Sequence, residues 1–136
     1  MHAEIAVTVD SVVLCKFKNR FKIVLVKRKN DPFKNQWALP GGFVEQEEDL
    51  PDAAKRELKE ETGLGVKKNE QIGTFGTPGR DPRGRTISVV YLSLIEHEEK
   101  LNAADDAAEA DWFDIDNLPD LAFDHSEIIK TANQYL

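Results

Sequence analysis

Three closely spaced glutamates carry the clearest chemical signal in the sequence. Glu57, Glu60 and Glu61 stand at i, i+3 and i+4 within "RELKEE". At about 100° per residue, this spacing places the three carboxylates on one face of a helix, where like charges oppose helix formation. Carboxylate oxygens are ligands that suit Mg²⁺ or Mn²⁺. The pattern therefore indicates a metal site, and a solvated acidic helix face is the alternative.

Clustered arginines indicate that the ligand is a small anion. The chain has a formal net charge of −7, which is opposite in sign to the charge that favours binding to a nucleic-acid backbone. Arg80, Arg83 and Arg85 nevertheless lie together in "RDPRGR", and Arg28 ends a predicted strand. Guanidinium groups match phosphate oxygens, so we predict that these four arginines bind substrate. The alternative is a salt-bridged turn for the three loop arginines and a solvated strand edge for Arg28. We expect Asp81 to pair with one of the loop arginines.

The strands that must position these residues are predicted from runs rich in β-branched and aromatic residues. They cover 5–17, 21–28, 70–76, 86–96 and 109–115. The first two are separated by the turn residues "KNR" and should form a hairpin. The stretch 29–42 is marked by Asn, Asp, Pro and Gly and is predicted to be a loop.

Two helices are predicted from their terminal residues. The first covers 50–62, because Asp49 is a favourable N-cap and Gly63 a favourable stop. The second follows a capping-box pattern that opens at Asp124, and it covers 126–136. The resulting order β-β-α-β-β-β-α predicts an α/β fold in which helices pack against a mixed sheet.

The length and composition predict one globular domain over residues 1–136. The chain is 40% hydrophobic and 32% charged, which argues against disorder. Its longest apolar stretch, "ISVVYLSLI", is too short to span a bilayer, and the N-terminus lacks the pattern of a signal peptide. We therefore expect a cytoplasmic protein with no membrane partner. The single cysteine, Cys15, should pack as a small hydrophobic residue.

The spacing around the glutamates resembles the signature of the Nudix hydrolases, Gly-x5-Glu-x7-Arg-Glu-apolar-x-Glu-Glu-x-Gly-apolar. Every fixed position is matched, by Gly42, Glu48, Arg56, Glu57, Leu58, Glu60, Glu61, Gly63 and Leu64. The resemblance implies an α/β/α sandwich with a mixed sheet. It also implies an enzyme that hydrolyses a nucleoside diphosphate linked to another group X.

The resemblance further implies roles for the signature residues. Glu57, Glu60 and Glu61 would hold Mg²⁺, with Mn²⁺ as a possible substitute, and the backbone carbonyl near Gly42 would be a further ligand. Arg56 would orient the glutamates. Such cations neutralise a pyrophosphate and lower the pKa of a bound water.

A carboxylate must then take the proton of the attacking water. Glu57 is one candidate, and in this family the base is often a glutamate outside the helix. We predict Glu109, in "AEADWF", ahead of Glu96, Glu98 and Glu99, and a surface glutamate is the alternative. By the same resemblance, Glu48 would complete the metal shell or pair with Arg56.

Longer stretches of the chain resemble the ADP-ribose pyrophosphatase subgroup. These stretches are "WALPGGFVE", "TFGTPGRDPRGRTISVVYLSL", "EADWF" and "LPDLAFDH". The resemblance implies ADP-ribose as substrate, with AMP and ribose 5-phosphate as products. Trp37 and Phe33 would stack an adenine or support the core. His125 is expected to be structural.

Two other functions are compatible with the signature. The first is the cleavage of an ordinary or oxidised nucleoside triphosphate, because substrate choice lies outside the signature. The second is a non-catalytic module that senses ADP-ribose, as in regulators of NAD metabolism. The chain reaches Leu136 directly after its last predicted helix, and the signature glutamates are intact, so we expect the enzyme. Family habit also implies a homodimer.

Overall fold

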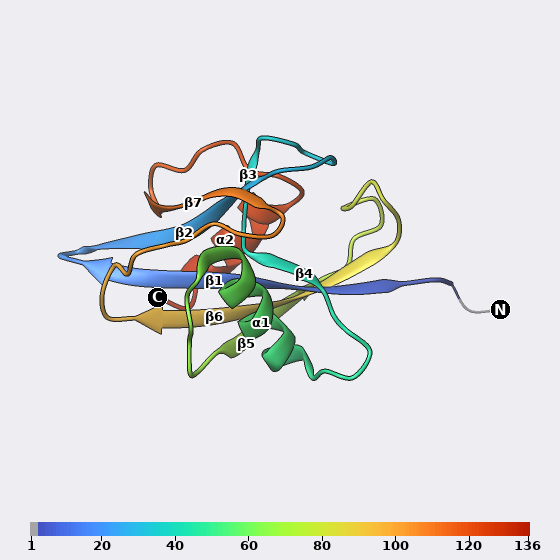
Figure 1. The fold of residues 1–136 in the computed structure, drawn as a ribbon, viewed down its shortest axis with the longest axis horizontal. Helices are drawn as coiled ribbons and strands as arrows, with labels where there is room; N and C mark the ends of the chain where they lie inside the picture. The colour runs from blue at the N-terminus through green and yellow to red at the C-terminus, as the bar shows by residue number, and fades with distance from the viewer. Residues whose placement is uncertain (1–2) are drawn as a thin grey trace.

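A mixed sheet with one helix on each face makes up the computed structural model, which describes residues 3–136 (Figure 1). The strands are β1 (Ala6–Phe17), β2 (Arg20–Arg28), β3 (Trp37–Ala38), β4 (Gly41–Phe43), β5 (Glu70–Phe75), β6 (Thr86–Ile95) and β7 (Ala107–Asp114). The helices are α1 (Leu50–Thr62) and α2 (His125–Asn133). The main strand order is β3-β2-β1-β6-β5, while β4 pairs with β1 and β7 with β2. Among the strand pairs within residues 3–136, β1 and β6 pair in parallel and the others are antiparallel.

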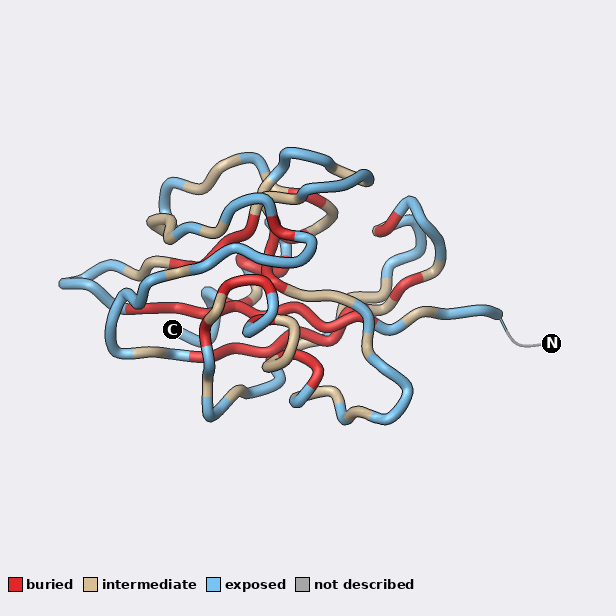
Figure 2. The backbone as a smooth tube through the Cα atoms, in the orientation of Figure 1, coloured by how far each residue is buried: buried red, intermediate tan, exposed pale blue. Residues whose placement is uncertain are grey.

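Side chains alternate across the central strands and give the sheet two apolar faces. On β1, Val9 and Val13 pack with residues of α1, whereas Val12 and Leu14 pack with residues of α2. This period of two is expected for a strand that is covered on both sides. Figure 2 shows that the buried backbone runs through these central strands. The sheet is therefore the middle layer of the predicted α/β/α sandwich.

Most of the predicted elements are confirmed. The hairpin predicted from the first two strands is formed by β1 and β2, which pair antiparallel from Leu14 and Ile23 to the turn. The prediction of a loop over 29–42 was wrong in part, because β3 lies within it and β4 begins in it. These strands are two and three residues long and contain no repeating pattern. Their pairing with β2 and β1 decides their conformation.

The caps of α1 form as its terminal residues predict. The Asp49 side chain accepts a hydrogen bond from the Leu50 N–H. At the other end, Gly63 has a φ of 81°, in the left-handed region that glycine tolerates best, and its N–H donates to the Lys59 carbonyl. These two caps fix the predicted helix over 50–62 at both ends.

Within residues 3–136, neither helix combines the length and the apolar character that a membrane crossing needs.

The predicted N-cap residue of α2 is confirmed, but its capping hydrogen bond does not form. Asp124 is the N-cap residue, but its side chain makes no cap hydrogen bond. Its carboxylate instead accepts two hydrogen bonds from Arg80, from Nε at 2.9 Å and from Nη2 at 2.6 Å. A charged guanidinium outcompetes a backbone N–H for a carboxylate, because both partners of the bond are ionised. This contact ties the loop before β6 to the start of α2.

Candidate active site

One cavity of about 370 Å³ collects charged side chains of both signs. Its volume lies in the range of small-molecule sites. The carboxylates in its lining are Asp10, Asp31, Glu45, Glu57, Glu61, Asp81 and Asp106. The arginines in its lining are Arg28, Arg56, Arg80 and Arg83. Helix α1, the Leu39–Phe43 segment and the loop before β6 therefore converge here.

Arg56 organises the acidic side of this cavity. Its Nε and Nη2 donate to the two carboxylate oxygens of Glu48, at 2.8 and 2.6 Å. Its Nη1 donates to Glu57 at 2.8 Å and to Glu60 at 3.2 Å. The hydrogen bonds from Arg56 lower the pKa of Glu48 to about 2. Of the two roles expected for Glu48, its pairing with Arg56 is seen in these contacts, while the orienting role of Arg56 stays a prediction.

Glu61 lies apart from this arginine network. It is buried, and its Oε1 accepts a hydrogen bond from the Gly41 N–H at 2.7 Å. Burial raises the pKa of Glu61 to about 8, against the opposing effect of the Gly41 hydrogen bond, and the negative charge of Glu57 adds to the rise. Burial also raises the pKa of Glu57. A cation bound beside these two carboxylates would offset the cost of ionising them.

The donor set fits a divalent cation in type and charge. Glu57 and Glu61 offer hard oxygen ligands, and the Gly42 backbone lies against Glu57. A Cβ added at Gly42 would lie 2.6 Å from Cδ of Glu57, so only glycine allows this approach. Glu60 lies outside the cavity lining, with 42% of its side chain exposed. Among residues 3–136, no three acidic, His or Cys side chains already converge as a metal shell.

The predicted substrate arginines divide into two groups. Arg28, Arg80 and Arg83 line the cavity, whereas Arg85 lies outside the lining and donates to the Gly76 carbonyl. Arg80 is almost fully buried and is held by its bidentate contact with Asp124.

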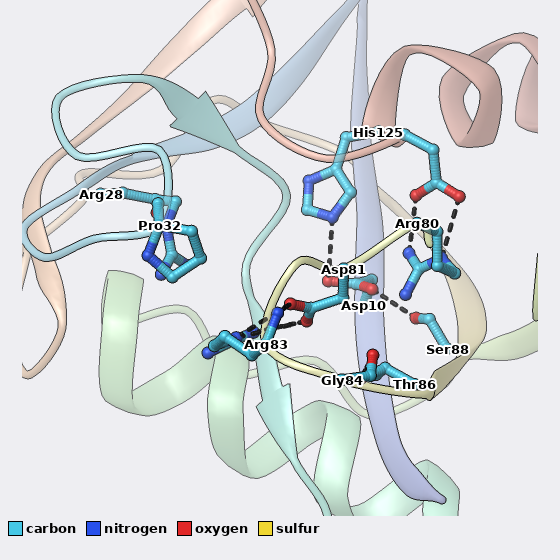
Figure 3. Close-up of polar contacts among 11 residues, drawn as sticks. Asp10, Arg28, Pro32, Arg80, Asp81, Arg83, Gly84, Thr86, Ser88 and His125 are labelled. Atoms are coloured by element: carbon cyan, nitrogen blue, oxygen red, sulfur yellow. Dashed lines mark hydrogen bonds and ion pairs between the residues drawn. The ribbon is translucent and has the colours of Figure 1, made fainter. Parts of the chain in front are cut away.

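Asp81 pairs with Arg83 as predicted, through contacts of 2.8 to 3.3 Å (Figure 3). Burial and the positive charge of Arg83 lower the pKa of Arg28, whose Nε donates to the Pro32 carbonyl at 2.6 Å. Two guanidinium groups that repel each other inside one cavity favour a bound anion.

Phenyl rings hold these two guanidinium groups. The Arg28 guanidinium carbon lies 5.0 Å from the centre of the Phe123 ring, and that of Arg83 lies 5.5 Å from it. Arg83 also lies 4.9 Å from the Phe43 ring. Phe33, one of the two predicted adenine partners, packs against Phe123, and their ring centres are 4.7 Å apart. These contacts restrict both arginines before any ligand binds.

The other predicted residues lie away from the cavity. Glu109 is outside the lining, with 60% of its side chain exposed, and it pairs with Lys27 at 3.2 Å. Its role as base stays a prediction. Trp37 is partly buried and packs edge-on against Phe113, with ring centres 4.7 Å apart, which matches its alternative role as core support. Cys15 is buried as predicted.

The comparison with known proteins identifies the family. Residues 6–132 match the family profile described as the NUDIX domain. The chain belongs to the Nudix family. The mixed sheet between two helices is therefore the Nudix fold, and solved structures agree. A TM-score of 0.91 relates the chain to the NUDIX domain of Shewanella oneidensis NrtR complexed with ADP ribose, at 30% identity, over 98% of this chain and 90% of the other.

Two curated relatives extend the comparison. An ADP-ribose pyrophosphatase from Methanocaldococcus jannaschii is 51% identical over 92% of this chain and 71% of its own length. The ADPR responsive transcriptional repressor NtrR from Acinetobacter baylyi is 36% identical over 92% of this chain. This chain spans only 52% of the length of that repressor. The family match and the pyrophosphatase relative together support a Nudix hydrolase.

Two acidic residues of the cavity lining, Asp10 and Asp106, lie outside the Nudix signature and were not predicted. Asp10 accepts a hydrogen bond from Ser88, and its Oδ1 lies 3.6 Å from Nε2 of His125 (Figure 3). Asp106, which precedes β7, completes the acidic lining. A carboxylate in the middle of the apolar run "VTVDSVV" is the sequence signal that marks Asp10. Asp106 lies in an acidic, polar stretch and carries no such signal.

Proposed function

We propose that this chain is a Mg²⁺-dependent hydrolase that cleaves ADP-ribose to AMP and ribose 5-phosphate. One observation carries the proposal: buried carboxylates and phenyl-held arginines line the same cavity. That combination suits a pyrophosphate that is bound partly by cationic side chains and partly through a metal. ADP-ribose is proposed as the substrate because the 51%-identical relative is named an ADP-ribose pyrophosphatase and the NrtR domain was solved with ADP ribose.

The residues that would hold the metal are Glu57, Glu61 and the backbone carbonyl near Gly42. Glu60 would join them from its more exposed position on α1. When bound, the metal would polarise a P–O bond and lower the pKa of the attacking water. Arg56 keeps Glu57 and Glu60 in place through hydrogen bonds to each carboxylate.

The arginines would bind the substrate phosphates. Arg28 and Arg83 face one cavity from two different elements, and their mutual repulsion is relieved when an anion lies between them. Arg80 donates two hydrogen bonds to Asp124, so it would contribute positive potential and rigidity rather than a guanidinium group that is free to bind phosphate. Glu57 and Glu109 are the two candidates for the base.

The testing experiment measures product formation from a substrate panel. Purified protein is incubated with Mg²⁺ and with ADP-ribose, other sugar nucleotides, dinucleotides or triphosphates, with and without a chelator. Chelator-sensitive release of AMP, fastest from ADP-ribose, is expected. Faster release of pyrophosphate from a triphosphate would refute the substrate assignment while leaving the metal site in place.

Two variants make the test specific to the site. Glu57→Gln should lose most turnover, whereas Glu70→Gln, on the exposed β5 edge, is a matched control and should keep it. ADP-ribose that binds without turnover would favour a sensing module, the function in the name of the repressor.

Other predictions follow from the same proposal. We propose that residues 1–136 act as one Nudix domain, in the cytoplasm and without nucleic-acid or membrane partners. The homodimer stays a prediction. Sedimentation of the purified protein would decide it.

A further inference from the structure

Three polar contacts fix the segment Leu39–Gly42 from different sides. The Leu39 N–H donates to Nδ1 of His125 at 3.0 Å. The Pro40 carbonyl accepts from the Ser11 N–H at 2.9 Å. The Gly41 N–H donates to Glu61 at 2.7 Å. The segment therefore connects the first residue of α2 to a carboxylate of α1, across the edge of the sheet.

His125 is itself held from its other side. Because Nδ1 accepts from Leu39, the ring proton lies on Nε2, which faces Oδ1 of Asp10 at 3.6 Å. Ser88 donates to the other carboxylate oxygen of Asp10. His125, Asp10 and Ser88 are all buried, with at most 6% of each residue exposed. A chain of polar groups buried this deeply restricts the ring to one orientation.

Asp10 also touches the segment directly. A Cβ added at Gly41 would lie 2.4 Å from Oδ1 of Asp10 and 2.2 Å from the Val9 carbonyl oxygen. The Gly41 backbone is thus pressed between β1 on one side and Glu61 on the other. A shift of the Leu39 amide would be passed to Gly41, two residues on, because these contacts leave the segment little room.

We propose that His125 is a positioning residue for the predicted metal site. Through the Leu39 N–H it sets the path of Leu39–Gly42, and through the Gly41 N–H that path sets the Glu61 carboxylate. This inference rests on the proposed function for its kinetic readout. It extends the role expected from the sequence, where His125 was only structural.

The test uses two amide isosteres of histidine that each keep one contact. His125→Asn places an amide oxygen near Nδ1 and keeps an acceptor for Leu39, whereas His125→Gln reaches toward Asp10 and loses that acceptor. The first readout is the amide resonances of Leu39 and Gly41 in metal-free protein, by ¹⁵N-resolved NMR. We expect both resonances to shift in His125→Gln and to stay close to wild type in His125→Asn.

The second readout separates kcat from KM. Support residues behind metal ligands typically change activity by about 10- to 100-fold when they are mutated. We expect His125→Gln to lose about tenfold or more in kcat, with KM within about threefold of wild type, and His125→Asn to restore most of the loss. Thermal melting confirms that each variant is folded.

The possible results separate the inference from the proposed function. If His125→Gln leaves the Gly41 resonance and kcat unchanged, or if both variants lose activity equally, the positioning role is wrong. If wild-type protein shows no ADP-ribose turnover, the proposed function fails instead. The NMR comparison then still decides the inference, since it needs neither metal nor substrate.

Discussion

Gly42→Ala should abolish most turnover without unfolding the protein. The new Cβ would lie 2.6 Å from Cδ of Glu57 and 2.7 and 2.8 Å from its two oxygens. To regain an ordinary contact of 3.4 Å or more, the carboxylate must move by about 0.8 Å. A misplacement of about 1 Å at a reacting centre can cost roughly 100-fold in rate. We therefore expect kcat/KM to fall by about 30- to 100-fold, or about 2–3 kcal/mol of transition-state stabilisation.

The stability of this variant should change little. The clash is with the end of a flexible side chain, and Glu57 can rotate away while the backbone stays in place. Gly65→Ala is the matched control, because an added Cβ at Gly65 meets no atom within 4 Å. Gly41→Ala is the opposite control, because its Cβ would meet the Val9 carbonyl oxygen at 2.2 Å. Backbone cannot yield as a side chain does, so Gly41→Ala should lower the free energy of unfolding.

The assay combines steady-state ADP-ribose hydrolysis with urea denaturation for all three variants. The reasoning requires Gly42→Ala to be folded and slow, Gly65→Ala to be folded and fast, and Gly41→Ala to be destabilised. A folded Gly42→Ala protein with wild-type kcat/KM would show that the position of Glu57 does not matter for catalysis. That result would refute the role proposed for Glu57.

Two further substitutions test the core and the buried charge. Leu58→Ala removes a fully buried side chain that packs with Val13 and Val24, and it should cost about 2–5 kcal/mol in urea denaturation, with unchanged activity per folded molecule. Glu61→Gln concerns a carboxyl whose pKa is raised to about 8 from 4.5. Between these pH values the unfolded chain has released its proton and the folded chain has kept it, so this group lowers stability as pH rises. In chelator, the variant should therefore gain stability over wild type from pH 5 to pH 9, by on the order of a few kcal/mol, and lose activity. If the stability of both proteins depended on pH in the same way, the burial argument would be contradicted. At pH 9, Mg²⁺ should stabilise only the wild type.

Local sequence was sufficient where one segment decides its own structure. Helix α1 was predicted within its observed bounds, because Asp49 and Gly63 set its two ends. The hairpin of β1 and β2 was predicted for the same reason, from residues that are adjacent in the chain. The signature glutamates also follow from local spacing, since a helix determines which of its residues share a face.

Prediction failed where residues far apart in the chain compete for one partner. Asp124 has the sequence of a helix cap, but Arg80, 44 positions earlier, takes its carboxylate. Glu109 lies opposite Lys27 of β2 in the strand register and pairs with it there. No local pattern reveals the strand that will lie beside β7, so the pairing of Glu109 with Lys27 does not follow from the sequence, and the role of Glu109 as base stays a prediction.

The acidic face of α1 is stable because its carboxylates are divided between two partners. Arg56 binds Glu57 and Glu60, together with Glu48 from the preceding loop, and so offsets much of their repulsion. Glu61 does not contact that arginine, and burial raises its pKa to about 8 against the opposing effect of one backbone hydrogen bond. A metal would therefore stabilise the folded chain most through Glu61. Because Glu61 is held by Gly41, the precision of the site depends as much on the Leu39–Gly42 segment as on the helix that carries the signature.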